Sequence, residues 1–323
     1  MNPQSTRILL TGTSHPKLSQ SISEHLKQPL GRMEVRRFLD AEIFVEIQEN
    51  VRGRDCFVIQ PTCFPVNDSL MELLIILDTL KRSSAERITA VVPYFGYSRQ
   101  DRKTAPRTPI SAKLVADLLE KAGATRVLSV DLHAGQIQGF FNIPFDNLYA
   151  APVMYESIRQ SMKNFDDVVI VSPDAGGVER ARLYADELGA TVAMIDKRRT
   201  QANVAKAMNV IGDVVGRRAI ILDDMIDTAG TLTEAATAVL GKGATEVSAV
   251  ATHGVFSGTA FDRITQSSLK EVIVTDSIPQ KEASLKCAKI KVQSIAPLLA
   301  EAIHRISTHG SISELFKKKS LRA

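Results

Sequence analysis

Cysteine is scarce in this sequence of 323 residues, which contains three cysteines and no Cys-x-x-Cys pair. So small and odd a number argues against a disulfide framework, and the missing pair argues against a zinc site. Both features are typical of proteins in a reducing compartment, so we expect a cytoplasmic location.

Long hydrophobic runs are also missing. The most apolar stretch, residues 70–80, is interrupted by Glu72 and Asp78, whereas a membrane span needs about 20 apolar residues. Near the amino terminus, the apolar run of residues 8–10 is too short for the core of a signal peptide. The sequence therefore predicts neither a membrane segment nor a secretion signal.

An excess of charge of one sign is missing as well, because 40 Lys and Arg residues stand against 36 Asp and Glu residues. The resulting net charge of +4 does not indicate a dedicated nucleic-acid binder. It leaves room for a small anionic ligand, which needs only local basic residues. With 44% hydrophobic and 24% charged residues, the composition is that of a globular protein, and the length predicts about two domains.

Short apolar runs alternate with amphipathic segments along the chain. The expected strands are residues 7–10, 34–38, 56–60, 88–93, 126–131, 167–171, 191–195, 219–222, 246–251 and 271–275. The expected helices are residues 17–26, 67–81, 111–121, 153–162, 178–188, 232–240 and 297–307. This alternation indicates βαβ units and a largely parallel sheet.

An internal repeat indicates two related domains. Residues 123–133 align without gaps on residues 243–253, with identity at six of the eleven positions. At the same offset, Ser111 matches Thr231, and each lies at the start of an expected helix. Similar patterns arise by chance in α/β proteins, but this degree of identity favours a duplication.

The boundary between the two domains is expected within residues 141–152, where Pro144 and Pro152 interrupt a stretch without clear periodicity. The domains are then residues 1–149 and 150–323, and we expect roughly the last 15 residues to pack back on the first domain. The predicted fold class is α/β, with two tandem related domains that each contain a largely parallel sheet flanked by helices.

The strongest signal for a ligand site lies in residues 219–231. A fully apolar strand ends there in Asp223 and Asp224, a short loop of small residues follows, and a helix opens at Thr231. Loop N–H groups and a helix N-terminus together bind phosphate, and paired acids accept hydrogen bonds from sugar hydroxyls. A capped turn with solvated acids is the structural alternative, but it does not explain two acids directly after a buried strand.

Two basic segments also follow expected strands. Residues 99–103 carry cations that suit an oligophosphate, and residues 196–199 carry three cations that suit a phosphoryl group. A solvated basic surface is the structural alternative for both. His133 and Asp174 each follow an apolar strand as well, but their spacing is not that of metal ligands, so the residues alone do not predict a metal site.

In combination, these segments resemble the ribose-phosphate diphosphokinases, or phosphoribosyl-pyrophosphate synthetases. Residues 221–231 resemble the phosphoribosyl-binding loop of the type I phosphoribosyltransferase fold. The narrower resemblance is carried by residues 93–103, 131–134, 172–177 and 195–199. It extends from about residue 8 to residue 316, which is nearly the whole chain.

The resemblance implies that ATP donates its β,γ-diphosphoryl group to the 1-hydroxyl of ribose 5-phosphate. It implies Lys197 and Arg199 as catalytic residues, and His133 and Asp174 as the residues that bind Mg²⁺. The implied contacts of ribose 5-phosphate are Arg199, Asp223, Asp224, Asp227, Thr228, Ala229, Gly230 and Thr231. The implied contacts of ATP are Phe38, Asp40, Ala41, Glu42, Arg99 and Gln100.

The resemblance also implies a homo-oligomer, a hexamer in this family, with phosphate and ADP as effectors. Several positions depart from the family pattern. Ala41 replaces a usual glycine, so its turn must differ if the backbone conformation of that glycine matters. Ala175 replaces a frequent histidine, Gly135 a frequent proline, and Asn50 a frequent serine near the regulatory phosphate site.

Two other functions stay open on the residues alone. A phosphoribosyltransferase would use the same loop, although the basic residues 99–103 and the duplication argue against it. A catalytically silent homologue would regulate active subunits, although the chain retains both implied catalytic residues and both implied metal-site residues. We expect no nucleic-acid and no membrane partner.

Overall fold

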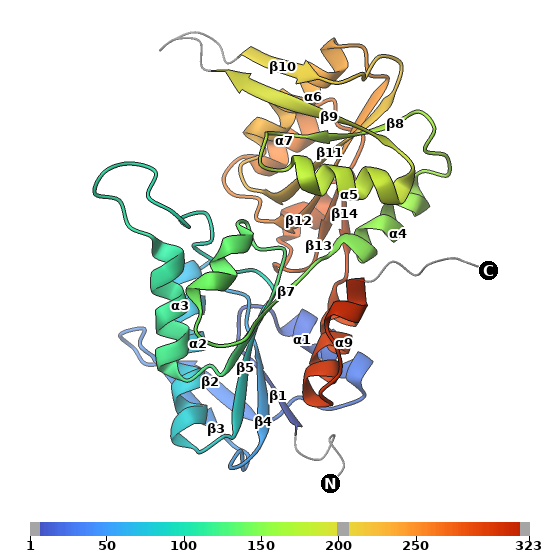
Figure 1. Ribbon diagram of the computed structural model, residues 1–323. Coiled ribbons are helices and arrows are strands. Elements are labelled where there is room, and N and C mark those ends of the chain that lie inside the picture. The colour runs from blue at the N-terminus through green and yellow to red at the C-terminus, as the bar shows by residue number, and fades with distance from the viewer. Residues whose placement is uncertain (1–6, 199–206, 317–323) are drawn as a thin grey trace, which may run out of the picture. The chain divides into compact units, whose positions relative to one another are not determined.

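A computed structural model of the chain describes residues 7–198 and 207–316. The chain forms two compact units (Figure 1). Unit 1 comprises Met1–Ala150, Ser277–Pro279 and Ser294–Ala323, and unit 2 comprises Ala151–Asp276 and Gln280–Gln293. Among the described residues, no helix is long and apolar enough to cross a membrane.

The sheet of unit 1 has five parallel strands that lie side by side in chain order. They are β1 (Arg7–Thr11), β4 (Asp55–Ile59), β5 (Arg87–Val92), β6 (Arg126–Val130) and β7 (Phe145–Leu148). Every residue of β4 is buried, as expected for a parallel strand covered on both faces. The sequence did not predict β7, a strand of four residues that pairs with β6.

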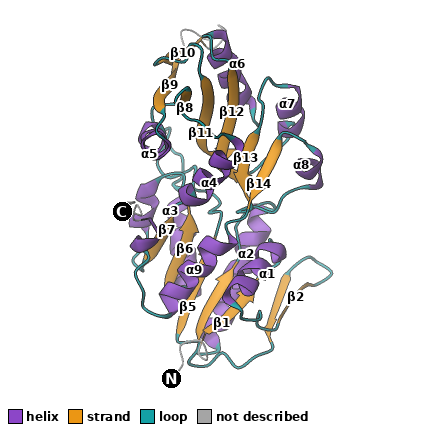
Figure 2. Cartoon of the chain, turned by 90° about the vertical axis from the view of Figure 1, so that its right-hand side faces the viewer, coloured by secondary structure: helices purple, strands orange, loops and turns teal. Residues whose placement is uncertain are grey.

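Helices cover both faces of this sheet (Figure 1). They are α1 (Pro16–Leu26), α2 (Val66–Arg82), α3 (Ser111–Ala122) and α9 (Ala296–Ser307), and two 3-10 turns are η2 (Gly135–Phe140) and η3 (Ser313–Phe316). The apolar faces of α2 and α3 pack with β4, β5 and β6 into one core. Helices α1 and α9 lie side by side away from them (Figure 1 and Figure 2).

The described end of the chain, residues 294–316, belongs to unit 1. Helix α9 belongs to this stretch, because its apolar side, with Leu299 and Ile303, is buried. The Arg7 guanidinium at the start of β1 donates a hydrogen bond of 2.9 Å to Ser307 Oγ at the end of α9. Packing on unit 1 removes the apolar face of α9 from water, which favours this position of the helix.

A separate antiparallel hairpin is formed in unit 1 by β2 (Met33–Arg37) and β3 (Ile43–Ile47). The sequence predicted the first of these strands and missed the second. Strand β3 contacts α2, and Met33, Val45 and Ile47 of the hairpin pack against the core that α2 helps to form. Its turn carries Phe38, Asp40 and Glu42, which are all exposed.

The sheet of unit 2 has seven strands in the order β10, β9, β8, β11, β12, β13, β14. They are β8 (Val168–Ser172), β9 (Thr191–Arg198), β10 (Ala207–Ile211), β11 (Arg218–Ile226), β12 (Glu246–Gly254), β13 (Val272–Thr275) and β14 (Ile290–Gln293). Only β10 is antiparallel to its described neighbour. The sequence missed β10 and β14, which are short.

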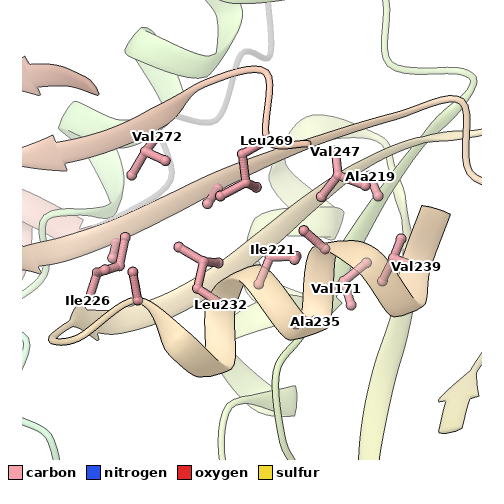
Figure 3. Close-up of a cluster of buried hydrophobic side chains, with 14 of the residues drawn as sticks. Val171, Ala219, Ile221, Ile226, Leu232, Ala235, Val239, Val247, Leu269 and Val272 are labelled. Atoms are coloured by element: carbon pink, nitrogen blue, oxygen red, sulfur yellow. The ribbon is translucent and has the colours of Figure 1, made fainter. Parts of the chain in front are cut away.

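Five helices accompany the sheet of unit 2. They are α4 (Ala151–Ser161), α5 (Val178–Leu188), α6 (Gly230–Gly241), α7 (Ala260–Gln266) and α8 (Glu282–Lys286). The apolar face of α6, with Leu232, Ala235 and Val239, packs on Ile221 and Val247 of the strands beneath it (Figure 3). This packing fixes the position of the amino end of α6 against the strand that precedes it.

The repeated segments occupy equivalent places in the two sheets. Residues 123–133 follow α3 and contain β6. Residues 243–253 follow α6 and contain most of β12. Strand β6 lies between β5 and β7, and β12 lies between β11 and β13. The two units are therefore related α/β folds, as the repeat predicted.

Candidate functional site

Unit 2 contains a topological switch point between β8 and β11. From β8 the chain moves outward to β9, and it later continues on the other side with β11 and β12. Open parallel sheets bind ligands outside the carboxyl ends of the strands at such a point. The loops after β8 and β11, residues 173–177 and 227–229, both lie there.

The loop after β11 leaves the amino end of α6 without a side-chain cap. The N-cap residue, Ala229, adopts a left-handed conformation with φ of 59° and offers no side-chain acceptor. The first N–H groups of a helix have no partner within the helix, and its dipole favours a negative charge there. Because these donors are uncapped, the loop has the properties of a phosphate cradle.

A residue that the sequence analysis missed supports this loop. Arg263 of α7 donates a hydrogen bond of 3.0 Å from Nη1 to the carbonyl oxygen of Thr228. A Cβ atom at Gly230 would lie 2.9 Å from that Nη1, so glycine at this position permits the close approach. No spacing in the sequence connects Arg263 to the loop.

The acid pair lies within β11, not after it as predicted. The strand continues to Ile226 along β12, whereas its described pairing with β8 ends at Ile221. Asp223 and Asp224 therefore have a strand neighbour on the β12 side, while β8 ends at Ser172. The sequence pattern missed this extension because only the part flanked by two strands is wholly apolar.

The two carboxyl groups are close enough to influence each other. The Asp224 N–H donates a hydrogen bond of 2.9 Å to Asp223 Oδ1, and Asp224 is buried. Burial, followed by the negative charge of Asp224, raises the pKa of Asp223 to about 8. At neutral pH the pair can therefore offer both acceptors and a donor to sugar hydroxyls.

Asp174 shapes the loop after β8. Its Oδ1 accepts hydrogen bonds from the N–H groups of Gly176 (3.0 Å) and Gly177 (3.1 Å). The Ser172 hydroxyl donates to the Asp174 carbonyl oxygen at 2.6 Å. The loop is thus folded around Asp174, whose side chain lies at the surface, and the replacement residue Ala175 is also exposed.

His133, the other implied metal-site residue, follows β6 in unit 1 and is exposed. The neighbouring Asp131 is buried and accepts a hydrogen bond of 3.0 Å from the Ala150 N–H. A Cβ atom at Gly135 would meet open space, so a side chain at this position has room. His133 belongs to unit 1, whereas Asp174 belongs to unit 2.

Among the described residues, no group of three or more His, Cys, Asp or Glu side chains has the arrangement of a metal site. Mg²⁺ commonly binds through one or two carboxylates together with its own waters and substrate phosphates. The exposed carboxylate of Asp174 is a suitable donor of this kind.

The two basic segments are described to different extents. Arg199 lies outside the described residues, and Lys197 is described only by its backbone, which pairs with Met208 across β9 and β10. In unit 1, Arg99 and Gln100 are exposed in the loop after β5. Gln100 is attached to the start of α3 by a side-chain hydrogen bond with Ser111.

Ala41, which stands where a glycine is usual, lies in the turn of the β2–β3 hairpin. Ala41 adopts a φ of 73°, the left-handed region that favours glycine. The turn is closed by hydrogen bonds from the Ala41 N–H to the Phe38 carbonyl (3.0 Å) and from the Phe38 N–H to the Glu42 carbonyl (2.9 Å). These bonds hold the alanine in a conformation that it rarely adopts.

Phe38 is supported in an exposed position. Its ring meets that of Phe44 edge-on at a centroid distance of 5.8 Å, and the Arg36 guanidinium lies 4.0 Å from the Phe44 centroid. The guanidinium is 5.1 Å from the Phe38 ring. The hairpin thus holds an accessible aromatic ring beside the two acids Asp40 and Glu42.

A cavity of about 470 Å³ lies elsewhere in unit 1, at the amino ends of its strands. Asp55 and Arg87, the first residues of β4 and β5, line it together with His309. None of the residues predicted for the site lines this cavity. It is therefore separate from the candidate site.

Family models match most of the chain. The N-terminal domain of ribose phosphate pyrophosphokinase matches residues 7–123, and the phosphoribosyl synthetase-associated domain matches residues 198–317. Relatives named ribose-phosphate pyrophosphokinase agree with this. One from Wolinella succinogenes is 54% identical over 95% of this chain and 98% of its own. One from Maricaulis maris is 58% identical over 95% of this chain and 99% of its own.

The fold agrees as well. The crystal structure of phosphoribosylpyrophosphate synthetase from Mycobacterium smegmatis superposes with a TM-score of 0.89 at 43% identity, covering 94% of this chain and all of that one. Similarity of this extent includes both units and the predicted site segments. The chain therefore belongs to the ribose-phosphate pyrophosphokinase family of enzymes.

Proposed function

We propose that the chain transfers the β,γ-diphosphoryl group of ATP to the 1-hydroxyl of ribose 5-phosphate, which yields 5-phosphoribosyl 1-diphosphate and AMP. One observation carries this proposal: the uncapped amino end of α6 lies directly after the acid pair at the switch point of unit 2. A phosphate cradle next to sugar-hydroxyl acceptors matches the two ends of a phosphorylated ribose.

In this proposal, unit 2 binds ribose 5-phosphate. The loop from Asp227 to Thr231 holds the 5-phosphate, and Asp223 and Asp224 accept hydrogen bonds from the ribose hydroxyls. Arg199 is assigned to the same substrate by resemblance. Holding the sugar in one orientation aims its 1-hydroxyl at the β-phosphorus, and such positioning supplies much of the acceleration in phosphoryl transfer.

Unit 1 is proposed to bind ATP. The exposed ring of Phe38 offers a stacking surface for the purine, and Asp40 and Glu42 offer acceptors for its amino group. Arg99 and Gln100, exposed in the loop after β5, are assigned to the nucleotide. We assign Mg²⁺ to His133 and Asp174, where it neutralises charge on the triphosphate when bound.

Lys197 and Arg199 are proposed as the catalytic cations. Phosphoryl-group transfer spreads negative charge over the transferred oxygens and the leaving group, and fixed cations stabilise that charge. We assign no general base, because no described residue is placed for that role by the observations above. The homo-oligomer, the hexameric state and the cytoplasmic location remain predictions from resemblance and composition.

Control by phosphate and ADP is also proposed by resemblance. Asn50, which replaces a frequent serine, accepts a hydrogen bond of 3.2 Å from the Arg52 N–H through its side-chain oxygen. A serine hydroxyl also accepts such a bond, so the departure preserves this turn. The Arg52 guanidinium donates to Ser84 Oγ at 3.4 Å.

The test is the release of AMP from ATP in the presence of Mg²⁺ and inorganic phosphate, with and without ribose 5-phosphate. Release that depends on ribose 5-phosphate supports diphosphoryl transfer. ADP in place of AMP overturns the reaction type and indicates an ordinary kinase. Tight binding of both substrates without turnover overturns the proposal in favour of a silent regulatory homologue.

A further inference from the structure

An arginine that no motif includes lies beside the acid pair. Arg180 is in the first turn of α5, which follows the loop after β8. Its Nη1 atom is 3.8 Å from Asp224 Oδ1. The side chain of Asp224 is only 9% exposed, and that of Arg180 is 29% exposed. The contact therefore joins α5 to a buried carboxyl group on β11.

The charge around this contact needs compensation. Asp223 and Asp224 are adjacent, and Asp174 adds a further negative charge that acts on Asp223. Removing carboxylates from water is costly unless a cation or hydrogen-bond donors compensate for the lost hydration. Arg180 supplies a positive charge on the side of Asp224, where burial is greatest.

We propose that Arg180 is a positioning residue of the sugar site, which holds the Asp224 carboxylate in place beside Asp223 so that the pair meets the ribose hydroxyls in one arrangement. This inference depends on the proposed function of the acid pair. Arg180 itself needs no contact with the substrate. Its effect passes through Asp224, which is the residue within ion-pair distance.

The distance indicates which property of Arg180 matters. At 3.8 Å the contact is an ion pair and not a hydrogen bond, which requires a separation near 3 Å. The positive charge is therefore more important than the planar geometry of the guanidinium. A lysine at this position should consequently preserve most of the effect.

The experiment measures binding of ribose 5-phosphate and of 2-deoxyribose 5-phosphate to the purified full-length protein by calorimetry. In Arg180→Gln, we expect Kd for ribose 5-phosphate to rise about tenfold, as for loss of a coupled contact of about 1.4 kcal/mol. The deoxy sugar lacks one hydroxyl that the acid pair would bind, so its Kd should rise less. Arg180→Lys should recover most of the affinity.

The matched control is Arg182→Gln, which removes the same charge from an exposed position on the same helix. Its Kd values should equal those of the wild type. Melting temperatures show whether each variant is folded. If Arg180→Gln does not fold, Arg180→Lys is compared with the wild type by the ratio of Kd for ribose 5-phosphate to Kd for 2-deoxyribose 5-phosphate. A lysine variant with lower affinity for both sugars to the same extent contradicts the inference.

A double-mutant cycle separates an indirect role from a direct one. If Arg180 acts through Asp224, Arg180→Gln should have no further effect on binding in an Asp224→Asn background. Additive losses would show that Arg180 contacts the substrate itself and would overturn the inference. If Asp223→Asn and Asp224→Asn both bind ribose 5-phosphate as the wild type does, the proposed sugar site is wrong, which is a different failure.

Discussion

The two units use the same strand–helix–strand segment with very different connections. In unit 1, residues 93–110 join β5 to α3 and carry an exposed basic stretch. In unit 2, residues 227–229 join β11 to α6 directly at an uncapped helix end. The strands and helices of the repeat are similar, so the two units differ mainly in the loops at the carboxyl ends of the strands, where sheets of this kind bind ligands.

The two sheets also differ in strand order. The strands of unit 1 lie in chain order, whereas those of unit 2 change direction between β8 and β11. The second arrangement separates two loops to opposite sides of the sheet at its switch point. Strand β11, which borders that point, carries the acid pair and is followed by the uncapped amino end of α6.

Substitutions in the basic segments of the two units should change the kinetics most, and in different ways. Lys197→Ala in unit 2 should lower kcat about a thousandfold, because it removes a cation proposed to stabilise the transition state. Lys103→Ala, in the exposed loop of unit 1, should mainly raise KM for ATP, by about tenfold or less. Steady-state kinetics of AMP release measure both. Near wild-type kcat in Lys197→Ala would refute its catalytic role.

The next prediction compares the stability lost when either of two ion pairs at the amino ends of the strands is broken. Arg87 pairs with Asp55 at 2.6 Å in unit 1, and the Asp55 side chain is 5% exposed. Arg218 pairs with Asp167 in unit 2, where the carboxylate is 49% exposed. Arg87→Gln should therefore lower the free energy of unfolding by about 2 kcal/mol, because it leaves a buried carboxylate, and Arg218→Gln should lower it much less, because Asp167 is exposed.

Denaturant unfolding at neutral pH measures these two costs. The Oδ1 atom of Asp55 is buried without a hydrogen-bond partner among the described residues. The ion pair between Asp55 Oδ2 and Arg87 is therefore more important for compensating the buried charge. Equal costs for the two variants would show that burial does not distinguish the two edges.

A third prediction concerns the stability of the folded state, which should depend on pH because of the acid pair in unit 2. The pKa of Asp223 is raised from its ordinary value of 3.8 to about 8, so between these values the folded state holds a proton that the unfolded state has lost. The folded state is therefore favoured at low pH, and its stability falls as pH rises toward 8. Asp223→Asn should remove this loss.

Melting temperatures at pH 5.5, 7 and 8.5 test this prediction, where the three pH values are chosen to span the titration at about 8. The difference between Asp223→Asn and the wild type should grow with pH in favour of the variant. Asp262→Asn, at an exposed position on α7, serves as the control and should show a constant difference. A constant difference for Asp223→Asn as well would contradict the raised pKa.

The smallest effect contrasts two alanines with positive φ, one in each unit. Ala41 is exposed in the hairpin turn, whereas Ala229 is 5% exposed against the core of unit 2. Glycine relieves the backbone strain at both, but it loses a buried methyl group only at Ala229. Ala41→Gly should stabilise by about 0.5 kcal/mol, and Ala229→Gly should be about neutral. Calorimetric unfolding that gave equal gains would contradict this account.

The alternation of strands and helices, the duplication and the small-residue loop before α6 could all be predicted from the sequence. They depend on local features: the period of apolar residues, the similarity of residues 123–133 to 243–253, and small residues between a strand and a helix. The order of motifs also identified the family, which the relatives confirm.

Tertiary packing, by contrast, selects which short segments become strands, where α9 packs and which arginines reach the candidate site. Strands β7 and β14 have four residues each and depend on a neighbouring ladder for their stability. Arg180 and Arg263 reach their partners across separate elements. Contacts of this kind join residues far apart in the chain, so no local pattern encodes them, and the packing of the sheets alone brings them together.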